Sequence, residues 1–273
     1  MDISAIQIAE LAVAVIAAGA ISGLLAGVFG IGGGTVLVPV LYQGLTFLGT
    51  DDTVRMQVSV GTSIAIIVPT AIQSFAAHRR RGAVDMELLR HWLVPLPIGV
   101  ILASIVAATI SGAALRAIFA VIASAVAIRL LFNRDTWRLG ADLPGNPALA
   151  IIGLLVGFFS TLMGIGGGVL NNTFMTLFGR PMHQAVATSS GVGVIISIPG
   201  IIGYMWAGWG HAGLPPLSTG FVNLPAMLLI IPSSVLAAPW GVRLAHALTR
   251  RQLEVAFGLF LIFVAARFAI SLV

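Results

Sequence analysis

The sequence contains the same five residues, Gly-Ile-Gly-Gly-Gly, at positions 30–34 and again at 164–168, each time between strongly apolar stretches. A glycine inside a helix lowers its stability by about 1 kcal/mol relative to alanine. Four glycines in five residues therefore interrupt any helix that contains them. We expect helices to stop at both places, the first and the second glycine motif.

The stretches around these motifs are typical of an integral membrane protein. Of the 273 residues, 58% are hydrophobic and 8% are charged. Apolar stretches long enough to cross a hydrocarbon core of about 30 Å recur along the whole chain. The run at 8–29 is longer than the apolar region of a cleavable signal, so we expect a first membrane segment there.

The hydrophobic pattern divides the chain into two similar halves. Ten apolar segments are predicted, at about 8–30, 33–48, 55–76, 88–108, 113–132, 148–163, 167–178, 184–207, 222–247 and 252–272. Beyond the glycine motifs, Gly-Ala-Val-Asp at 82–85 matches Gly-Phe-Val-Asn at 220–223, and Val-Gly-Thr-Ser at 60–63 matches Val-Ala-Thr-Ser at 186–189. We therefore predict an all-α membrane protein with repeats at 1–132 and 148–273, joined by a linker at 133–147.

The positive charges predict how these repeats are oriented. The chain has arginine but no lysine, and connections rich in positive charge face the cytoplasm. The arginine-rich connections hold Arg79, Arg80, Arg81, Arg90, Arg134, Arg138, Arg180, Arg243, Arg250 and Arg251, and the opposite ones are expected to hold Asp51, Asp52, Arg55, Arg116 and His211. Both termini are then outside. Five segments per half make the second repeat inverted, with broken helices or re-entrant hairpins near the midplane.

Several classes of function are excluded or disfavoured. Without cysteine there is no thiolate site, and without lysine there is no Walker-type nucleotide loop. Thr35 and Val169 stand where a dinucleotide-binding loop needs glycine. No protease or hydrolase motif occurs, and the histidines lack ligand spacing. We expect no enzyme activity, no cofactor, no metal site and no nucleic-acid partner.

The glycine motifs suggest an anion site. Peptide N–H groups left unpaired at membrane depth need protein, water or a ligand, and the start of a helix favours negative charge. The predicted backbone contacts are Gly32, Gly33, Gly34, Thr35, Gly166, Gly167 and Gly168. Close helix packing through small residues is the alternative.

Polar side chains near the motifs are candidate walls of that site. Hydroxyls that match between the halves, Thr62, Ser63, Thr188 and Ser189, could donate to anion oxygens or bond to helix carbonyls. The amides of Asn171 and Asn172 could contact substrate or another helix. Arg129 and Arg267 lie near the ends of matching segments, where they either snorkel to the interface or bind an anion.

These residues resemble the TauE/SafE sulfite exporter family, also called 4-toluene sulfonate uptake permeases. The resemblance rests on the pattern at Gly23, Gly27 and 30–41, on 60–63, on 82–85 and on the second glycine motif. It implies a bacterial or archaeal inner-membrane carrier of sulfite or organosulfonates, exporting or importing. One difference is Thr173, where the family usually has proline, directly after Asn171 and Asn172.

Together these observations predict a secondary transporter of a small anion, sulfite or an organosulfonate, that works by alternating access. An anion channel, and a carrier of a sulfur-free organic anion, remain as alternatives. The expected partners are the anion, the lipid bilayer and a coupling ion, either a proton or sodium. A homodimer is left open.

Overall fold

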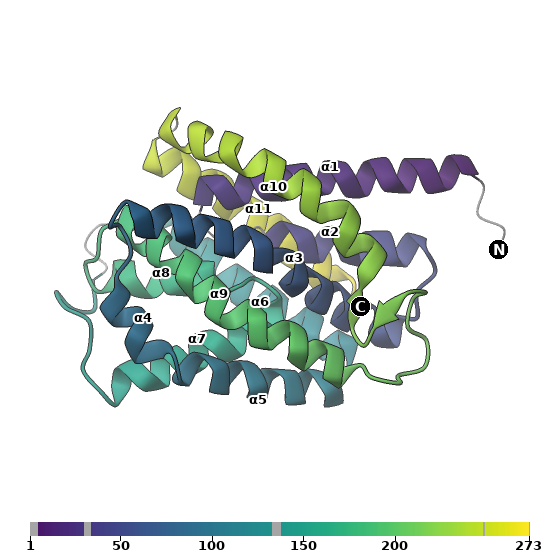
Figure 1. The fold of residues 1–273 in the computed structure, drawn as a ribbon, viewed down its shortest axis with the longest axis horizontal. Helices are drawn as coiled ribbons and strands as arrows, with labels where there is room; N and C mark the ends of the chain where they lie inside the picture. Colours follow the sequence, from purple (N-terminus) through teal and green to yellow (C-terminus); the bar gives the residue numbers. More distant parts are fainter. Residues whose placement is uncertain (1–4, 30–33, 133–137, 248, 273) are drawn as a thin grey trace.

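The computed structural model describes residues 5–29, 34–132, 138–247 and 249–272, and these are helical almost throughout (Figure 1). The helices are α1 (Ala5–Phe29), α2 (Gly34–Phe47), α3 (Asp52–Arg80), α4 (Met86–Trp92), α5 (Pro95–Thr109), α6 (Gly112–Leu131), α7 (Ala148–Met163), α8 (Gly168–Leu177), α9 (Met182–Ala207), α10 (Leu224–Ala247) and α11 (Arg250–Ile270). A short antiparallel hairpin, β1 (Ser218–Thr219) and β2 (Val222–Asn223), precedes α10.

Each predicted apolar segment corresponds to one helix, except the segment predicted at 88–108. There the chain forms α4 and α5, which meet at an angle of 48°. Pro95 is the first residue of α5, a position that proline favours because the first N–H of a helix has no partner inside the helix. The apolar segment predicted here is therefore built from two helices, and the proline starts the second one.

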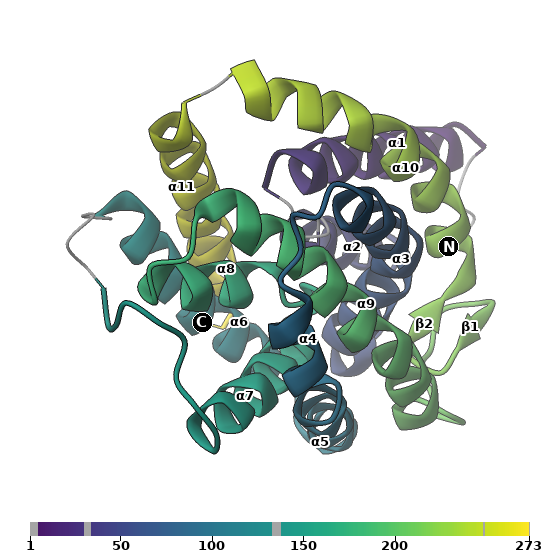
Figure 2. The same ribbon diagram turned by 60° about the vertical axis from the view of Figure 1, so that its left-hand side comes forward.

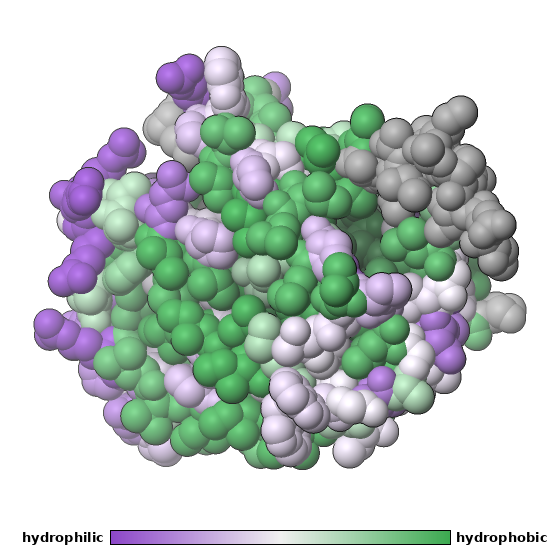
Figure 3. All heavy atoms as spheres, turned by 45° about the vertical axis from the view of Figure 1, so that its right-hand side comes forward, coloured by the Kyte–Doolittle hydropathy of each residue, from purple (hydrophilic) through white to green (hydrophobic). Residues whose placement is uncertain are grey.

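Several helices are long and apolar enough to cross a membrane. Within the described residues these are α3, α6, α9 and residues 224–241 of α10, and the bent pair α4–α5 would make a fifth span. Figure 3 shows a broad apolar face with hydrophilic residues gathered at its edges. Such a surface is stable in a hydrocarbon environment, so the chain is a multi-pass membrane protein.

Helices α3 and α9 form the centre of the molecule. More than half of the spanning stretch is buried in each of them (56% and 61%), compared with 17% in α10. Figure 2 shows the pairs α1–α10, α5–α7 and α6–α11 arranged around this centre. Every one of these pairs, and α3–α9 itself, joins a helix from before the linker to one from after it.

Small residues bring paired helices close together. A Cβ on Gly99 of α5 would stand 2.1 Å from the carbonyl oxygen of Leu154, and one on Gly157 of α7 would stand 2.4 Å from that of Leu96. These glycines permit the close backbone contact by which helices associate in membranes.

Candidate functional site

The second glycine motif is a buried break between α7 and α8, as predicted. Helix α7 ends at Gly164, which has φ 67°, and Gly166 and Gly167 have φ 62° and 82°. Only glycine adopts this left-handed region without strain. All residues from Ser160 to Val169 are buried, so the break lies inside the protein and not at its surface.

The break leaves peptide donors without acceptors. The N–H groups of Gly164 and Ile165 donate to Thr161 O and Ser160 O at 3.2 and 3.1 Å, which closes the end of α7. The first bond of α8 runs from Asn171 N–H to Gly167 O at 2.9 Å. In the part of the chain that the structure describes, the N–H groups from Gly166 to Leu170 meet no acceptor. Helix α8 thus begins with free donors in a buried space.

Buried side chains at the break also lack partners. Ser160 and Thr161 end α7 with fully buried hydroxyls, and the buried Asn171 begins α8; none of Ser160 Oγ, Thr161 Oγ1 and Asn171 Oδ1 has a hydrogen-bond partner among the described residues. Ser160 Oγ lies 3.7 Å from the point where a Cβ on Gly167 would stand. Buried polar atoms of this kind are normally satisfied by water or a ligand.

Two of these side chains were missed in the sequence. Ser160 and Thr161 are a polar pair two residues before the second glycine motif, near the end of an otherwise apolar segment. That position was the available signal, but the start of a helix, with its free N–H groups, favours the residues after the motif.

The first glycine motif is described only from Gly34 onward; Gly32 and Gly33 lie outside the described residues. Gly34 is buried and begins α2, and a Cβ there would stand 2.3 Å from Gly164 O and 2.8 Å from Ile165 Cα. The start of α2 therefore packs against the turn between α7 and α8, so the two motifs meet. Thr35, 1% exposed, has a hydroxyl without a partner among the described residues.

The matched hydroxyls of α3 and α9 bond to protein. Ser63 Oγ donates to Gly164 O at 2.8 Å, which fixes the turn before α8. Thr62 Oγ1 accepts the N–H of Asn223, and Thr188 Oγ1 accepts the N–H of Asp85, both at 2.9 Å. The matching residues of the two halves thus make matching contacts.

The caps next to these contacts match as well. Asp85 Oδ1 accepts the N–H of Leu88 at the start of α4, and Asn223 Oδ1 accepts the N–H of Ala226 at the start of α10, both at 3.0 Å. In each half the residue that caps a helix is held by a threonine of the other half.

The two asparagines and Ser189 form one network between α8 and α9. Asn171 Nδ2 donates to Ser189 Oγ, and Ser189 Oγ donates to Asn172 Oδ1, both at 2.7 Å. All three residues are buried. The network holds α8 against α9 and leaves Asn171 Oδ1 as an acceptor available to water or a ligand.

The two candidate arginines lie in different environments. Arg129 Nη2 donates to Thr176 Oγ1 of α8 at 2.9 Å, and the residue is half-buried. Arg267, its counterpart near the end of α11, is exposed. Of the two, Arg129 therefore contacts the helix that starts at the second glycine motif.

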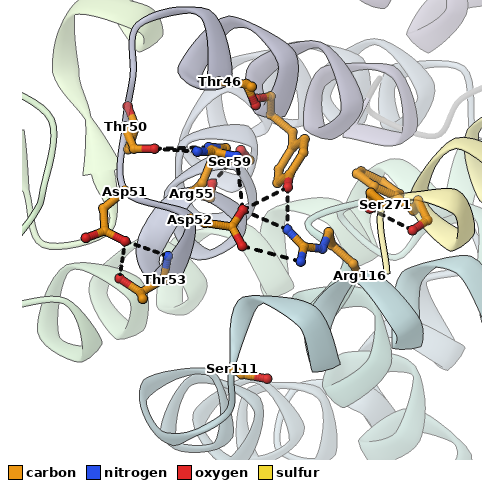
Figure 4. Close-up of polar contacts among 12 residues, drawn as sticks. Thr46, Thr50, Asp51, Asp52, Thr53, Arg55, Ser59, Ser111, Arg116 and Ser271 are labelled. Atoms are coloured by element: carbon orange, nitrogen blue, oxygen red, sulfur yellow. Dashed lines mark hydrogen bonds and ion pairs between the residues drawn. The ribbon is translucent and has the colours of Figure 1, made fainter. Parts of the chain in front are cut away.

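A second polar cluster, which the sequence did not predict, joins α2, α3 and α6 (Figure 4). Arg116 was expected in a connection, but it lies inside α6 and is only 5% exposed. It pairs with Asp52 and with the hydroxyl of Tyr42. Outside the spanning helices, the pKa of the nearby Asp51 carboxyl is lowered because the backbone N–H and hydroxyl of Thr53 donate to it.

Comparison with known proteins identifies the family of this chain. The family model described as "Sulfite exporter TauE/SafE" matches residues 15–268. A probable membrane transporter protein of Haemophilus influenzae is 31% identical over 90% of this chain and 94% of its own length. One of Methanocaldococcus jannaschii is 27% identical over 87% of each chain. No solved structure gives a significant match. The chain therefore belongs to the TauE/SafE sulfite exporter family of membrane transporters.

Proposed function

We propose that this protein is a secondary transporter that carries a small anion, sulfite or an organosulfonate, across the inner membrane by alternating access. The family supplies the class of substrate, and the relatives named above are described only as probable transporters. The coupling ion of such a carrier is a proton or sodium.

The observation that carries this proposal is the buried break between α7 and α8. There the N–H groups from Gly166 to Leu170 and the hydroxyl of Ser160 have no acceptor or partner among the described residues. Each unsatisfied group costs several kcal/mol in an apolar environment, so it is stable only with water or a ligand. Donors of this kind, at the positive end of a helix, suit the oxygens of a small anion.

The paired helices support an inverted repeat around this site. If each half contributes the same unit, α1 corresponds to α7, and α5 to α10. An operation that swaps the two halves then turns the pair α1–α10 into the pair α5–α7. It likewise turns the contact of Thr62 with Asn223 into that of Thr188 with Asp85. This arrangement suits two halves that rock around a site between them.

The connections support a cytoplasmic side and two external termini. Figure 1 places the end of α3 and the start of α11 at the left, and the α2–α3 link and the hairpin at the right. The end of α3 and the link after it hold the exposed Arg79, Arg80 and Arg81, and Arg251 near the start of α11 is exposed as well. Positive charge at one end favours the cytoplasm for that end.

The test is transport by the purified protein in sealed vesicles. Sulfite, taurine, sulfoacetate, acetate and phosphate are offered in turn, with imposed proton or sodium gradients. We expect saturable movement of sulfite or an organosulfonate that accelerates when substrate is present on the far side. Unitary currents would instead assign an anion channel, and a response only to acetate or phosphate would overturn the sulfur-containing substrate.

A further inference from the structure

Helix α6 carries two arginines, and each reaches a helix that begins at a glycine motif. Arg116 and Arg129 are thirteen positions apart, which corresponds to a rise of about 20 Å along an α-helix. Arg116 contacts α2, and Arg129 contacts α8. One helix therefore touches both short helices, and the start of α2 packs against the turn that precedes α8.

The contact at Arg116 is a fork of charge-assisted bonds (Figure 4). Its Nη1 donates to Tyr42 Oη and to Asp52 Oδ1, the latter at 2.9 Å, and its Nη2 lies 3.5 Å from Asp52 Oδ2. Tyr42 Oη also donates to Asp52 Oδ1 at 3.2 Å. Because Asp52 neutralises the guanidinium, Arg116 holds α2 and α3 and does not offer its charge to a substrate.

The contact at Arg129 likewise joins α6 to a side-chain hydroxyl, here on α8. Its Nη2 donates to Thr176 Oγ1 at 2.9 Å, and Thr176 Oγ1 donates in turn to Asn172 O at 2.7 Å. On α2, Thr46 Oγ1 makes the same kind of bond to its own helix, to Tyr42 O at 2.7 Å, four residues earlier.

The two contacts fall at the same distance from the glycine motifs. Tyr42 is eight positions after Gly34, and Thr176 is eight positions after Gly168, so each lies about 12 Å from the start of its helix. Each arginine thus holds its short helix at the same height above the starting end.

The far ends of the two short helices also match. Gly49 and Gly179 both have positive φ (69° and 76°). The N–H groups of Thr50 and Arg180 both donate to the carbonyl five residues earlier, at 3.0 Å. The two helices therefore end in the same turn geometry although α2 is longer, and α6 contacts both of them.

Helix α6 is itself held at both ends. Arg251 of α11 donates to Leu130 O at 3.0 Å and to Leu131 O at 2.6 Å, which caps the last turn of α6. At the other end, Phe268 of α11 packs edge-on against Phe119 of α6 and against Tyr42, with ring centroids 5.1 and 5.5 Å apart. The helix is thus fixed as a rigid support.

We propose that Arg116 and Arg129 are positioning residues of the anion site, through which α6 sets the alignment of the starting ends of α2 and α8. This inference rests on the function proposed above. The link at Arg116 requires arginine, because a lysine ammonium lacks the planar fork that reaches Tyr42 and Asp52 together.

The first experiment measures sulfite transport by Arg129→Gln, Thr176→Val and the double variant. Loss of the link misaligns the donors, so KM should rise about tenfold while the maximal rate changes less. The double variant should raise KM no more than Arg129→Gln alone, because Thr176→Val removes only a link that Arg129→Gln has already broken. Arg90→Gln, the same change at an exposed arginine of α4, is the matched control with unchanged KM.

At the other end of α6, Tyr42→Phe removes the hydrogen bond from Arg116 to α2 without leaving Asp52 unpaired, and should raise KM similarly.

The second experiment measures geometry without transport. Because the chain has no cysteine, spin labels can be attached to Phe47→Cys on α2 and Leu177→Cys on α8 alone. We expect one narrow distance distribution in the parent and a shifted or broader one with Arg129→Gln. Unchanged KM in the link variants, or an unchanged distance, overturns the positioning role. If the parent moves no tested anion, the proposed function fails, and the label distance still decides whether α6 aligns the two helices.

Discussion

A substitution at Ser160 distinguishes a role in anion binding from a role in stability. The buried hydroxyl of Ser160 has no partner among the described residues. Removal of an unsatisfied polar atom leaves stability unchanged or raises it. We therefore expect Ser160→Ala to keep its unfolding temperature while its KM for the anion rises about tenfold, the loss of one bond to a charged group.

The control is Ser63→Ala in the same region. Ser63 donates to Gly164 O, so its alanine variant should lose about 1 kcal/mol of stability, measured by thermal unfolding in detergent. A Ser160→Ala variant with normal KM would remove Ser160 from the site.

Gly167 combines a positive φ with a lack of space. A Cβ there would stand 2.6 Å from Ile196 Cδ1 and from Val192 Cγ1, and its φ is 82°. We expect Gly167→Ala to destabilise the protein by about 1–3 kcal/mol and to reduce transport, because the start of α8 is displaced. Gly145→Ala, where a Cβ would meet nothing within 4 Å, should leave both measurements unchanged. Equal unfolding temperatures in the two variants would contradict this argument.

For single residues, the sequence predicted which polar side chains lie near the break better than it predicted their hydrogen-bond partners. It selected Asn171, Asn172 and Ser189 as polar groups near the break, and the structure joins them in one network. Which hydroxyl faces which acceptor depends on rotamers and helix packing, and neither has a signature in a single sequence. For the same reason the sequence did not reveal that the hydroxyls of Ser160 and Thr161 have no partner among the described residues.

Thr62 and Thr188 each accept the N–H of a residue that caps a helix in the other half. Replacement by valine keeps the shape and removes the acceptor, which leaves a buried N–H unpaired. We expect Thr62→Val and Thr188→Val each to lower the free energy of unfolding by about 1–3 kcal/mol. The control, Thr109→Val, changes an exposed hydroxyl that bonds to its own helix, and should change stability little. Thermal unfolding checks this, and an effect confined to one of the two threonines would break their equivalence.

The elements themselves were largely predictable, because long apolar runs and glycine breaks act locally. One difference has a local cause: Pro95 starts α5 within the apolar run at 88–108, so the chain forms two helices there. Position 116 already falls in the apolar segment predicted at 113–132, and α6 matches that segment. The Ser111 side chain accepts the N–H of Ala114 at 3.2 Å and caps this helix. The partners of Arg116 come from α2 and α3, far away in the sequence, so its burial could not be predicted.

Across the whole molecule, the helix pairs α1–α10, α3–α9, α5–α7 and α6–α11 each join the two halves, and the two glycine motifs meet where Gly34 packs against Gly164. Sequence similarity between the halves predicted two related units, but not that they interlock. Interlocking matters for function, because neither half can then move without repacking against the other. The boundaries of the two repeats at 132 and 148 stay a prediction.

The charge at the two ends of the molecule predicts which end faces the cytoplasm. Exposed arginines at the end of α3 and in the link after it favour the cytoplasm for that end, and the link before β1, which holds His211, should then face outward. Since the chain contains no cysteine, His211→Cys and Glu87→Cys each supply one exposed thiol without background. In intact cells an impermeant maleimide should label His211→Cys and leave Glu87→Cys unlabelled, whereas both should react after detergent treatment. The reverse pattern would place the termini inside, and labelling of both in sealed cells would contradict the proposed path of the chain.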